Sequence, residues 1–272
     1  FQLNGLPTPV LWWIHEARAS YFPEAVAAMP ETIDSNVHVY CGGGYAERLL
    51  NEYRPNYKSK QLLYYVEDYN SRLEQGKCYE LLHASGKTVF AIVGMQEQRK
   101  GQDVLIEAIR MLPLERLKES YFVFIGRECY PPIKKQLLSL KGDYPENVCY
   151  IPQLGKEDLE NMYRRIDCLV CASRDDPMPI VVADAMSLSK VVICSENTGY
   201  CQIVEEMGGG LLYHRDDPHE LLECLMYVLE HQGELELLQK RARMTYERYF
   251  TQDKFMSNAA SAIYDLKLGD HN

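Results

Sequence analysis

The sequence predicts an α/β protein whose larger part is a doubly wound domain with a parallel sheet. From Lys87 onward, short apolar runs alternate regularly with amphipathic stretches, which is typical of successive β/α units. The 272 residues are 46% hydrophobic, enough to bury a packed core in one large or two medium domains. A sheet of this kind has one crevice at the carboxyl ends of its strands, where ligands bind.

Three apolar runs in the first part of the chain are strand candidates. They lie at residues 10–16, 37–40 and 61–66. Turns are expected at residues 42–44, where three glycines follow one another, and near Pro55. We expect a separate domain at residues 1–75 and a hinge at residues 76–86.

The larger domain is expected to span residues 87–250. Its strands are expected at residues 88–94, 121–126, 148–151, 167–171, 191–194 and 210–213. Its helices are expected at residues 101–112, 130–140, 156–165, 180–188, 200–207, 216–231 and 233–248. A final amphipathic helix at residues 251–267 belongs to a carboxyl-terminal segment, residues 251–272.

The charge and the apolar runs exclude some classes of protein. A net charge of −10 and a pI near 5.3 argue against a nucleic-acid partner, because phosphate backbones are met by clustered Lys and Arg. No apolar run approaches the roughly 20 residues that cross a bilayer, and the first residues lack the pattern of a signal peptide. We therefore expect a cytoplasmic location.

The nine cysteines favour the same compartment, because several lie inside apolar, strand-like runs where reduced thiols pack as small hydrophobes. Cys168 and Cys171 have the spacing of half a zinc site. No second Cys pair or His pair complements them, so core packing is the favoured interpretation and no metal site is predicted.

Two carboxylates, Asp176 and Asp184, are separated by seven residues, around a Pro-rich turn that opens an almost wholly apolar helix. Such a helix must be buried, so Asp184 needs a polar partner, and hydroxyls are good partners for a carboxylate. The free N–H groups at the start of the helix are good partners for a phosphate. One segment could thus hold both the sugar and the phosphate of a nucleotide sugar.

A second motif follows the first strand of the larger domain. Gly94 is followed by a short loop that carries Arg99 and Lys100 just before a helix. A glycine lets the backbone approach a phosphate closely, and a cation neutralises a diphosphate leaving group. The alternative is a solvated pair of loop charges at a helix start.

These two motifs resemble the acid-x7-acid motif and the donor-phosphate loop of the family-4 retaining glycosyltransferases, which have the two-domain GT-B fold. Residues 198–199, 203–205 and 208–213 are similar to the closing segment of that family. The three pieces occur in the family's order over roughly residues 88–215. Both acids are Asp where the family usually has Glu, and Met95 or Gln96 stands where an Arg is usual.

The resemblance implies a role for each matching residue. Asp176 would meet the hydroxyls of the transferred sugar, and Asp184 would take the ribose diol. Lys100 and Arg99 would face the diphosphate beside Gly94, and backbone N–H groups of residues 178, 180 and 181 would donate to it. The residues assigned to the donor are therefore Gly94, Arg99, Lys100, Gln153, Asp176, Met178, Pro179, Ile180, Asp184 and Gly199.

Other interpretations of these residues stay open. Asp176 could be a helix cap, and Asp184 a buried acid that is hydrogen-bonded to protein. Gln153 stands where this fold often meets the nucleobase, but it could equally be an ordinary loop residue. Gly199 lacks a Cβ and would let a sugar or phosphate lie close, or it could form a simple turn.

The first 75 residues resemble the second half of a GT-B amino-terminal domain, so we expect a partial domain from a longer protein. The resemblance places His15 beside the transferred sugar, where an imidazole can steady developing charge or relay a proton. A lone His after an apolar run is also often structural. In the family the last helix crosses back to the first domain, and we expect the same here.

The resemblance implies a metal-independent hexosyltransferase-type enzyme of polysaccharide biosynthesis. It would move a sugar, with retention, from a nucleotide diphosphate sugar to a hydroxyl of a glycan, lipid-linked or small-molecule acceptor. The catalytic residues would be His15, Lys100 and Asp176, and no cofactor beyond the donor would be needed. Peripheral membrane association through the full-length protein would fit a lipid-linked acceptor.

Two alternative functions belong to other classes of protein. A non-catalytic GT-B-like module could bind nucleotide sugars without transferring them. A Rossmann-type oxidoreductase would need Gly-x-Gly-x-x-Gly after its first strand, and the residues after Gly94 lack that spacing.

Overall fold

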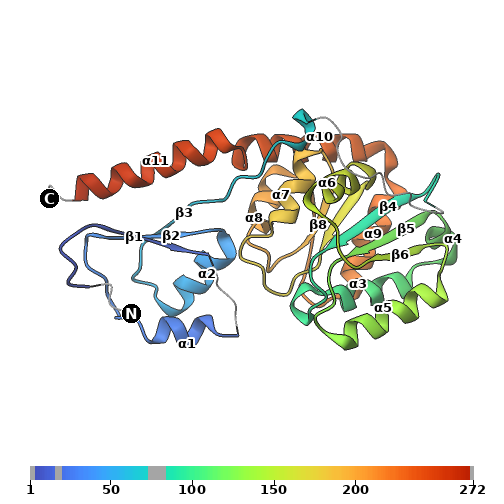
Figure 1. Cartoon of the computed structure of the whole chain (residues 1–272), viewed down its shortest axis with the longest axis horizontal. Helices are drawn as coiled ribbons and strands as arrows, with labels where there is room; N and C mark the ends of the chain where they lie inside the picture. Colours follow the sequence, from blue (N-terminus) through green and yellow to red (C-terminus); the bar gives the residue numbers. More distant parts are fainter. Residues whose placement is uncertain (1–3, 16–19, 73–83, 270–272) are drawn as a thin grey trace.

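The computed structural model describes residues 4–15, 20–72 and 84–269, which form two regions, each built around a parallel sheet (Figure 1). The predicted α/β fold with parallel sheets is confirmed. Most of the expected hinge, residues 76–86, lies outside the described residues.

The smaller region has a three-stranded sheet in the order β1-β2-β3. Its strands are β1 (Val10–Ile14), β2 (Val37–Cys41) and β3 (Ser59–Gln61). Helices α1 (Phe22–Ala27) and α2 (Gly44–Tyr53) pack on one face, around Ile14, Val39 and Cys41. Leu11, Trp13 and Tyr40 belong to a second cluster, and side chains of a strand point alternately to the two faces, so this sheet has a core on each side.

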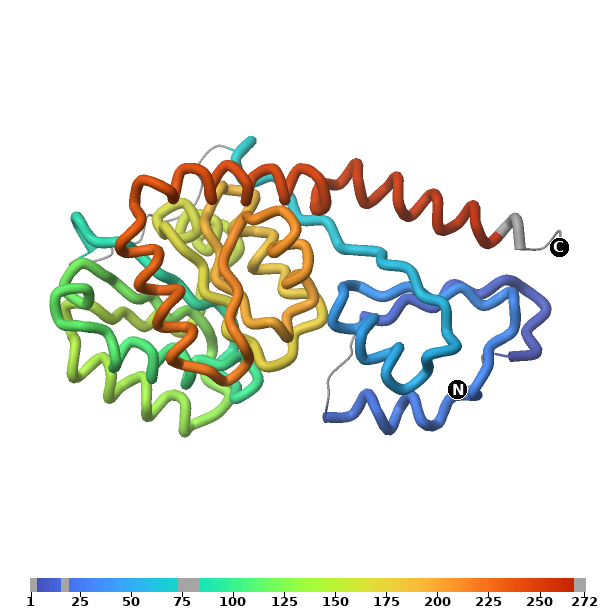
Figure 2. Tube along the Cα trace, turned by 180° about the vertical axis from the view of Figure 1, so that it is seen from behind, coloured from blue at the N-terminus to red at the C-terminus, as the bar shows by residue number. Residues whose placement is uncertain are grey.

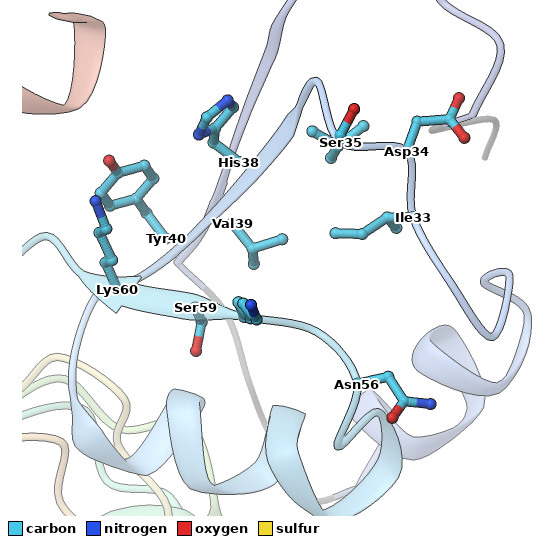
Figure 3. Close-up of a pocket in the computed structure, with 11 residues that line it drawn as sticks. Ile33, Asp34, Ser35, His38, Val39, Tyr40, Asn56, Ser59 and Lys60 are labelled. Carbon is cyan, nitrogen blue, oxygen red and sulfur yellow. The ribbon is translucent and has the colours of Figure 1, made fainter. Parts of the chain in front are cut away.

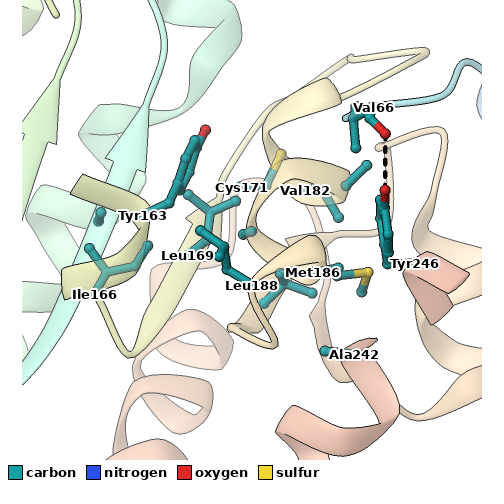
Figure 4. Packing of buried hydrophobic residues seen from close by; sticks show 14 of the residues in the cluster. Val66, Tyr163, Ile166, Leu169, Cys171, Val182, Met186, Leu188, Ala242 and Tyr246 are labelled. Carbon is teal, nitrogen blue, oxygen red and sulfur yellow. Dashed lines mark hydrogen bonds between the residues drawn. The ribbon is translucent and has the colours of Figure 1, made fainter. Parts of the chain in front are cut away.

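The third strand predicted for the smaller domain, residues 61–66, is wrong. The strand there is β3, which ends at Gln61, and the apolar residues after it leave the sheet. The Val66 N–H donates to the Phe250 carbonyl, and the Tyr246 hydroxyl donates to the Val66 carbonyl at 3.1 Å (Figure 4). The run is apolar because it enters the core of the larger region, so its composition resembles that of a buried strand.

The larger region has a six-stranded parallel sheet in the order β6-β5-β4-β7-β8-β9. Its strands are β4 (Thr88–Val93), β5 (Ser120–Ile125), β6 (Val148–Ile151), β7 (Cys168–Cys171), β8 (Val191–Ser195) and β9 (Gly210–Tyr213). The order reverses between β4 and β7, so the topological switch point lies at the carboxyl ends of these two strands.

Helices cover both faces of this sheet, as a doubly wound fold requires (Figure 1). One face carries α3 (Gln102–Met111), α4 (Leu114–Lys118), α5 (Pro131–Asp143) and α9 (Pro218–Glu230). The other carries α6 (Lys156–Arg165), α7 (Ile180–Ser187), α8 (Cys201–Met207) and α10 (Gln232–Tyr249). Two 3₁₀ turns lie in the connections, η1 (Tyr69–Ser71) and η2 (Gln98–Lys100).

The last helix, α11 (Gln252–Gly269), extends from the larger region along the sheet of the smaller one (Figure 2). Phe255, Ala259 and Ala262 pack against Tyr40 and Leu62. The Asp265 carboxylate accepts a hydrogen bond from Lys60 Nζ at 2.5 Å. The chain therefore joins the two regions twice, through residues 62–72 and through α11.

Candidate functional site

The loop after β4 and the loop after β7 meet at the switch point of the larger sheet. The first loop runs from Gly94 through η2 to α3, and the second runs from Ala172 to the start of α7. Lys100 Nζ lies 2.5 Å from Asp176 Oδ2 and donates a hydrogen bond to it. The structure thus brings together a cation and a carboxylate that the sequence assigned to one site.

Asp176 is 7% exposed, and its carboxylate has a second partner in Ser173, whose hydroxyl donates to Oδ2 at 3.4 Å. The Lys100 side chain passes Gly94, where an added Cβ would lie 3.5 Å from Lys100 Cδ. Gly94, Lys100 and Asp176 are therefore neighbours, and the charges of the partly buried pair compensate each other.

Arg99 belongs to the same group of residues. Its Nη1 donates to the Asp175 carbonyl at 3.0 Å and lies 3.9 Å from Asp176 Oδ2. The Arg174 N–H donates to the Arg99 carbonyl at 2.8 Å. Two cations thus stand beside Asp176, so an anionic ligand at this edge would find a positive partner.

Gly101 fixes how closely the two loops approach. Its φ of 67° lies in the left-handed region, and an added Cβ would lie 1.9 Å from the Ala172 carbonyl oxygen. Glycine is required here both by the backbone conformation and by the space. This contact sets the position of Lys100, the residue before it.

The closing segment pairs with the backbone of the acid motif. The Asp176 N–H donates to the Asn197 carbonyl at 3.1 Å, and the Gly199 N–H donates to the Asp176 carbonyl at 2.7 Å. An added Cβ on Gly199 would lie 1.7 Å from the Pro177 carbonyl oxygen. Close packing against protein, within this conformation, therefore accounts for the glycine at position 199.

The start of α7 faces the smaller region. Pro179 precedes the helix, and the Ile180 N–H donates to the Met178 carbonyl at 2.8 Å, so that amide already has a partner in this conformation. An added Cβ on Gly42 would lie 2.0 Å from Met178 Sδ, so the Met178 side chain covers the Gly-rich turn. The two regions touch at this point.

Asp184 contacts Tyr69 from the linker, with which it shares a side-chain hydrogen bond. It is 7% exposed, and burial raises its pKa to about 7. In this conformation Asp184 is thus a buried acid hydrogen-bonded to protein, and Tyr69 stands where the resemblance implies a ribose.

His15 and Gln153 lie apart from these contacts. The His15 ring packs against Trp13 and Tyr64, with centroids 4.2 and 5.2 Å away, and Nδ1 is hydrogen-bonded to the Tyr64 hydroxyl. Gln153 is exposed in the loop after β6. Burial raises the pKa of Tyr200, and the negative charges of Asp176 and Asp184 raise it further.

A cavity of about 660 Å³ opens beside these loops. Arg99, Arg174 and Asp175 line it together with Tyr130, Arg215 and, from the smaller region, Ser20. Its size is that of a small-molecule site. Arg99 lines this cavity, whereas its neighbours Lys100 and Asp176 do not.

A second cavity, of about 470 Å³, lies in the smaller region beside β2 and β3 (Figure 3). His38, Tyr40 and Lys60 line it, and it contains none of the residues that the sequence assigned to the site. Its lining residues all belong to the smaller region, whereas the switch point lies in the larger one.

Arg174 and Tyr69 were missed by the sequence analysis. Arg174 precedes the first acid by two residues, and that proximity was a usable signal. Tyr69 lies in a part of the chain with no motif, and nothing in its spacing indicates a contact with Asp184.

Residues 4–15, 20–72 and 84–269 contain no cluster of three metal-ligating side chains. In the same part of the chain, no helix has both the length and the apolarity that a bilayer crossing needs.

Comparisons with known proteins show the family and the fold of this chain. Residues 79–248, more than half of the chain, match the family model described as glycosyl transferases group 1. Spore coat protein SA of Bacillus subtilis is 25% identical over 187 residues, which are 66% of this chain and 49% of that protein. The chain therefore spans about half the length of this curated relative.

Solved structures share the fold at low identity. Sucrose-phosphate synthase of Thermosynechococcus elongatus has a TM-score of 0.72 and 18% identity, over 95% of this chain and 68% of that one. HepE of Anabaena, in complex with UDP, has a TM-score of 0.75 and 14% identity, over 94% and 72% of the two chains. These likenesses show the GT-B fold, and the matched family model shows that this chain belongs to the glycosyl transferases group 1 family.

Proposed function

We propose that the protein moves a sugar, with retention, from a nucleotide diphosphate sugar to an acceptor hydroxyl. The observation that carries the proposal is the meeting of Lys100 and Asp176 at the switch point, with Arg99 beside them. A diphosphate would replace Asp176 as the partner of Lys100, and the released carboxylate would accept hydrogen bonds from the sugar hydroxyls.

In the proposed reaction the bond between the anomeric carbon and the diphosphate oxygen breaks, and the acceptor oxygen bonds to that carbon from the same face. The acceptor proton passes to the departing diphosphate. Lys100 and Arg99 stabilise the negative charge that grows on the leaving group, and this stabilisation needs no metal. His15 would steady charge at the anomeric carbon after its ring separates from Tyr64.

The nucleotide is proposed to be UDP, which HepE binds in the structure of similar fold. The acceptor is proposed to be a glycan, a lipid-linked sugar or a small molecule in polysaccharide biosynthesis, with peripheral membrane association in the lipid-linked case. We propose a cytoplasmic location, which the thiols support: within the described ranges, the cysteines are free and most are buried.

Transfer activity tests the proposal. Lys100→Ala and Asp176→Ala should each lower kcat/KM at least about a hundredfold, because stabilisation of the leaving group or orientation of the sugar is lost. The assay is release of nucleoside diphosphate from a panel of nucleotide sugars and acceptors.

A matched control is Lys240→Ala. Lys240 also forms a close pair with a carboxylate, Glu236, at 2.7 Å, but on the exposed surface of α10. The Lys240→Ala variant should keep wild-type activity. Undiminished transfer by either site variant would exclude the mechanism.

One observation favours a second candidate function, a non-catalytic nucleotide-sugar-binding module. Asp184 is hydrogen-bonded to Tyr69, and Lys100 is hydrogen-bonded to Asp176, so these polar side chains already have partners within the protein in this conformation. Calorimetry that shows donor binding, together with no transfer and no hydrolysis under any condition of the panel, would favour this candidate over the enzyme.

A further inference from the structure

Arg174 lies two residues before Asp176, and its side chain binds protein on several sides. Its Nη1 and Nη2 donate to Asp103 Oδ1 and Oδ2 at 2.9 and 2.8 Å, a two-point contact between guanidinium and carboxylate. Asp103 is in the first turn of α3, where a carboxylate is also favoured by the helix dipole. Arg174 therefore ties the loop after β7 to the helix that follows the loop after β4.

Two further contacts involve the same guanidinium. Its Nη1 donates to the Gln98 carbonyl in η2, and its Nε pairs with Asp216 in the loop after β9. Asp216 has a φ of 61°, a left-handed conformation that is uncommon for a residue other than glycine. One side chain thus joins three separate segments around the switch point.

The loops that Arg174 holds carry the groups that face the ligand. Its own N–H donates to the Arg99 carbonyl, and the next residue but one is Asp176. A shift of the Arg174 guanidinium would therefore move Arg99 and Asp176 relative to each other. Such relative positions decide rate, because a misplacement of about 1 Å can slow a reaction roughly a hundredfold.

We infer that Arg174 is a positioning residue that sets the distance between Asp176 and the Arg99–Lys100 pair through Asp103, Gln98 and Asp216. The inference rests on the proposed function. Arginine suits this task because its planar fork offers five donors in fixed directions, whereas the lysine ammonium is a flexible point charge. A lysine at position 174 would keep the positive charge but would not reproduce these directed hydrogen bonds.

The test is Arg174→Lys, which keeps the charge and loses the fork. Its kcat should fall at least about tenfold at saturating donor, while its melting temperature stays close to that of the wild type. Asp103→Asn should lower kcat similarly, and the double variant should be no slower than the slower single variant, because both changes break one contact. A kcat of Arg174→Lys within about threefold of wild type would overturn the inference, as would fully additive losses.

The matched control is Arg110→Lys. Arg110 lies in the last turn of α3, at the other end of the helix from Asp103, and pairs with Asp143 at 2.8 Å, so its substitution should leave kcat unchanged. An equal fall of kcat in this control would assign the effect to general stability and overturn the inference. If the wild-type protein binds no nucleoside diphosphate and transfers no sugar, both the proposed function and this inference are overturned. If the wild type is active and Arg174→Lys is equally active, the inference alone is overturned.

Discussion

At the scale of single residues, the two acids of the motif differ in their surroundings. Asp176 has a cation at 2.5 Å, whereas Asp184 has the neutral Tyr69 hydroxyl. A buried carboxylate without a close cation favours its protonated form, and this is why the pKa of Asp184 rises to about 7. The same residue type thus forms an ion pair with Lys100 at one position and is a buried acid with a raised pKa at the other.

Asp184→Asn should change how stability depends on pH. The folded pKa of about 7 exceeds the unfolded value of 3.8, so the contribution of Asp184 is full below about pH 4 and is lost as pH rises through about 7. Wild type should therefore lose stability relative to the variant between pH 4.5 and 7.5, by a few kcal/mol at most.

The measurement is urea unfolding of both proteins at several pH values. Other carboxylates titrate equally in the two proteins, so the difference between the curves reports Asp184. Curves that stay parallel over this pH window would show that Asp184 is ionised in the fold.

At the scale of elements, the sequence predicted the bounds of helices and strands better than the contacts between them. The bounds of β6, α6 and β9 match the expected ranges, because periodicity and short apolar runs are local properties. The prediction of a strand at residues 61–66 is wrong because a linker that enters a core has the same apolar composition as a buried strand. The Arg174–Asp103 and Asp184–Tyr69 contacts join segments far apart in the chain, which spacing does not reveal.

Of the proposed site, the sequence located the loop residues Gly94, Arg99, Lys100 and Asp176, which the structure brings together. The expected ribose contact of Asp184 stays a prediction, and Tyr69 would have to move for it. The order of the motifs along the chain predicted the position of the crevice. The buried side chains that contact these motifs, such as Tyr69, come from distant parts of the chain and are identified only by the three-dimensional structure.

Gly101→Ala should destabilise the protein by roughly 2–4 kcal/mol, because the left-handed φ and the contact with the Ala172 carbonyl both oppose a Cβ. Nucleotide affinity should fall with it, since Lys100 is the preceding residue. Gly142→Ala in α5 is the control, because an added Cβ there meets no atom within 4 Å. Urea unfolding checks both, and equal stability of the two variants would contradict the account.

At the scale of the whole molecule, the linker at residues 62–72 is part of the larger core. Leu63, Val66 and Tyr69 pack in the same cluster as α7 and α10 (Figure 4). Arg243 of α10 donates to both oxygens of Asp68, at 2.7 and 2.8 Å. The two regions are therefore connected by a segment that is itself held in place.

Arg243→Met should lower the free energy of unfolding by roughly 1–2 kcal/mol, after allowance for the partial exposure of the pair. It should also speed hydrogen exchange of the Val66 amide, which donates to the Phe250 carbonyl. Arg248→Met on the same helix, whose pair with Glu206 is exposed and 3.8 Å long, should change neither. Unchanged exchange at Val66 in Arg243→Met would show that the linker is held by its apolar contacts alone.

The central claim is that the Lys100–Asp176 crevice binds the diphosphate of a nucleotide sugar. Isothermal titration of UDP into the wild type, Lys100→Ala and Lys240→Ala tests it most directly. We predict binding to the wild type and to Lys240→Ala, with affinity at least about tenfold weaker in Lys100→Ala. Equal affinity in all three proteins would place the nucleotide elsewhere and contradict the claim.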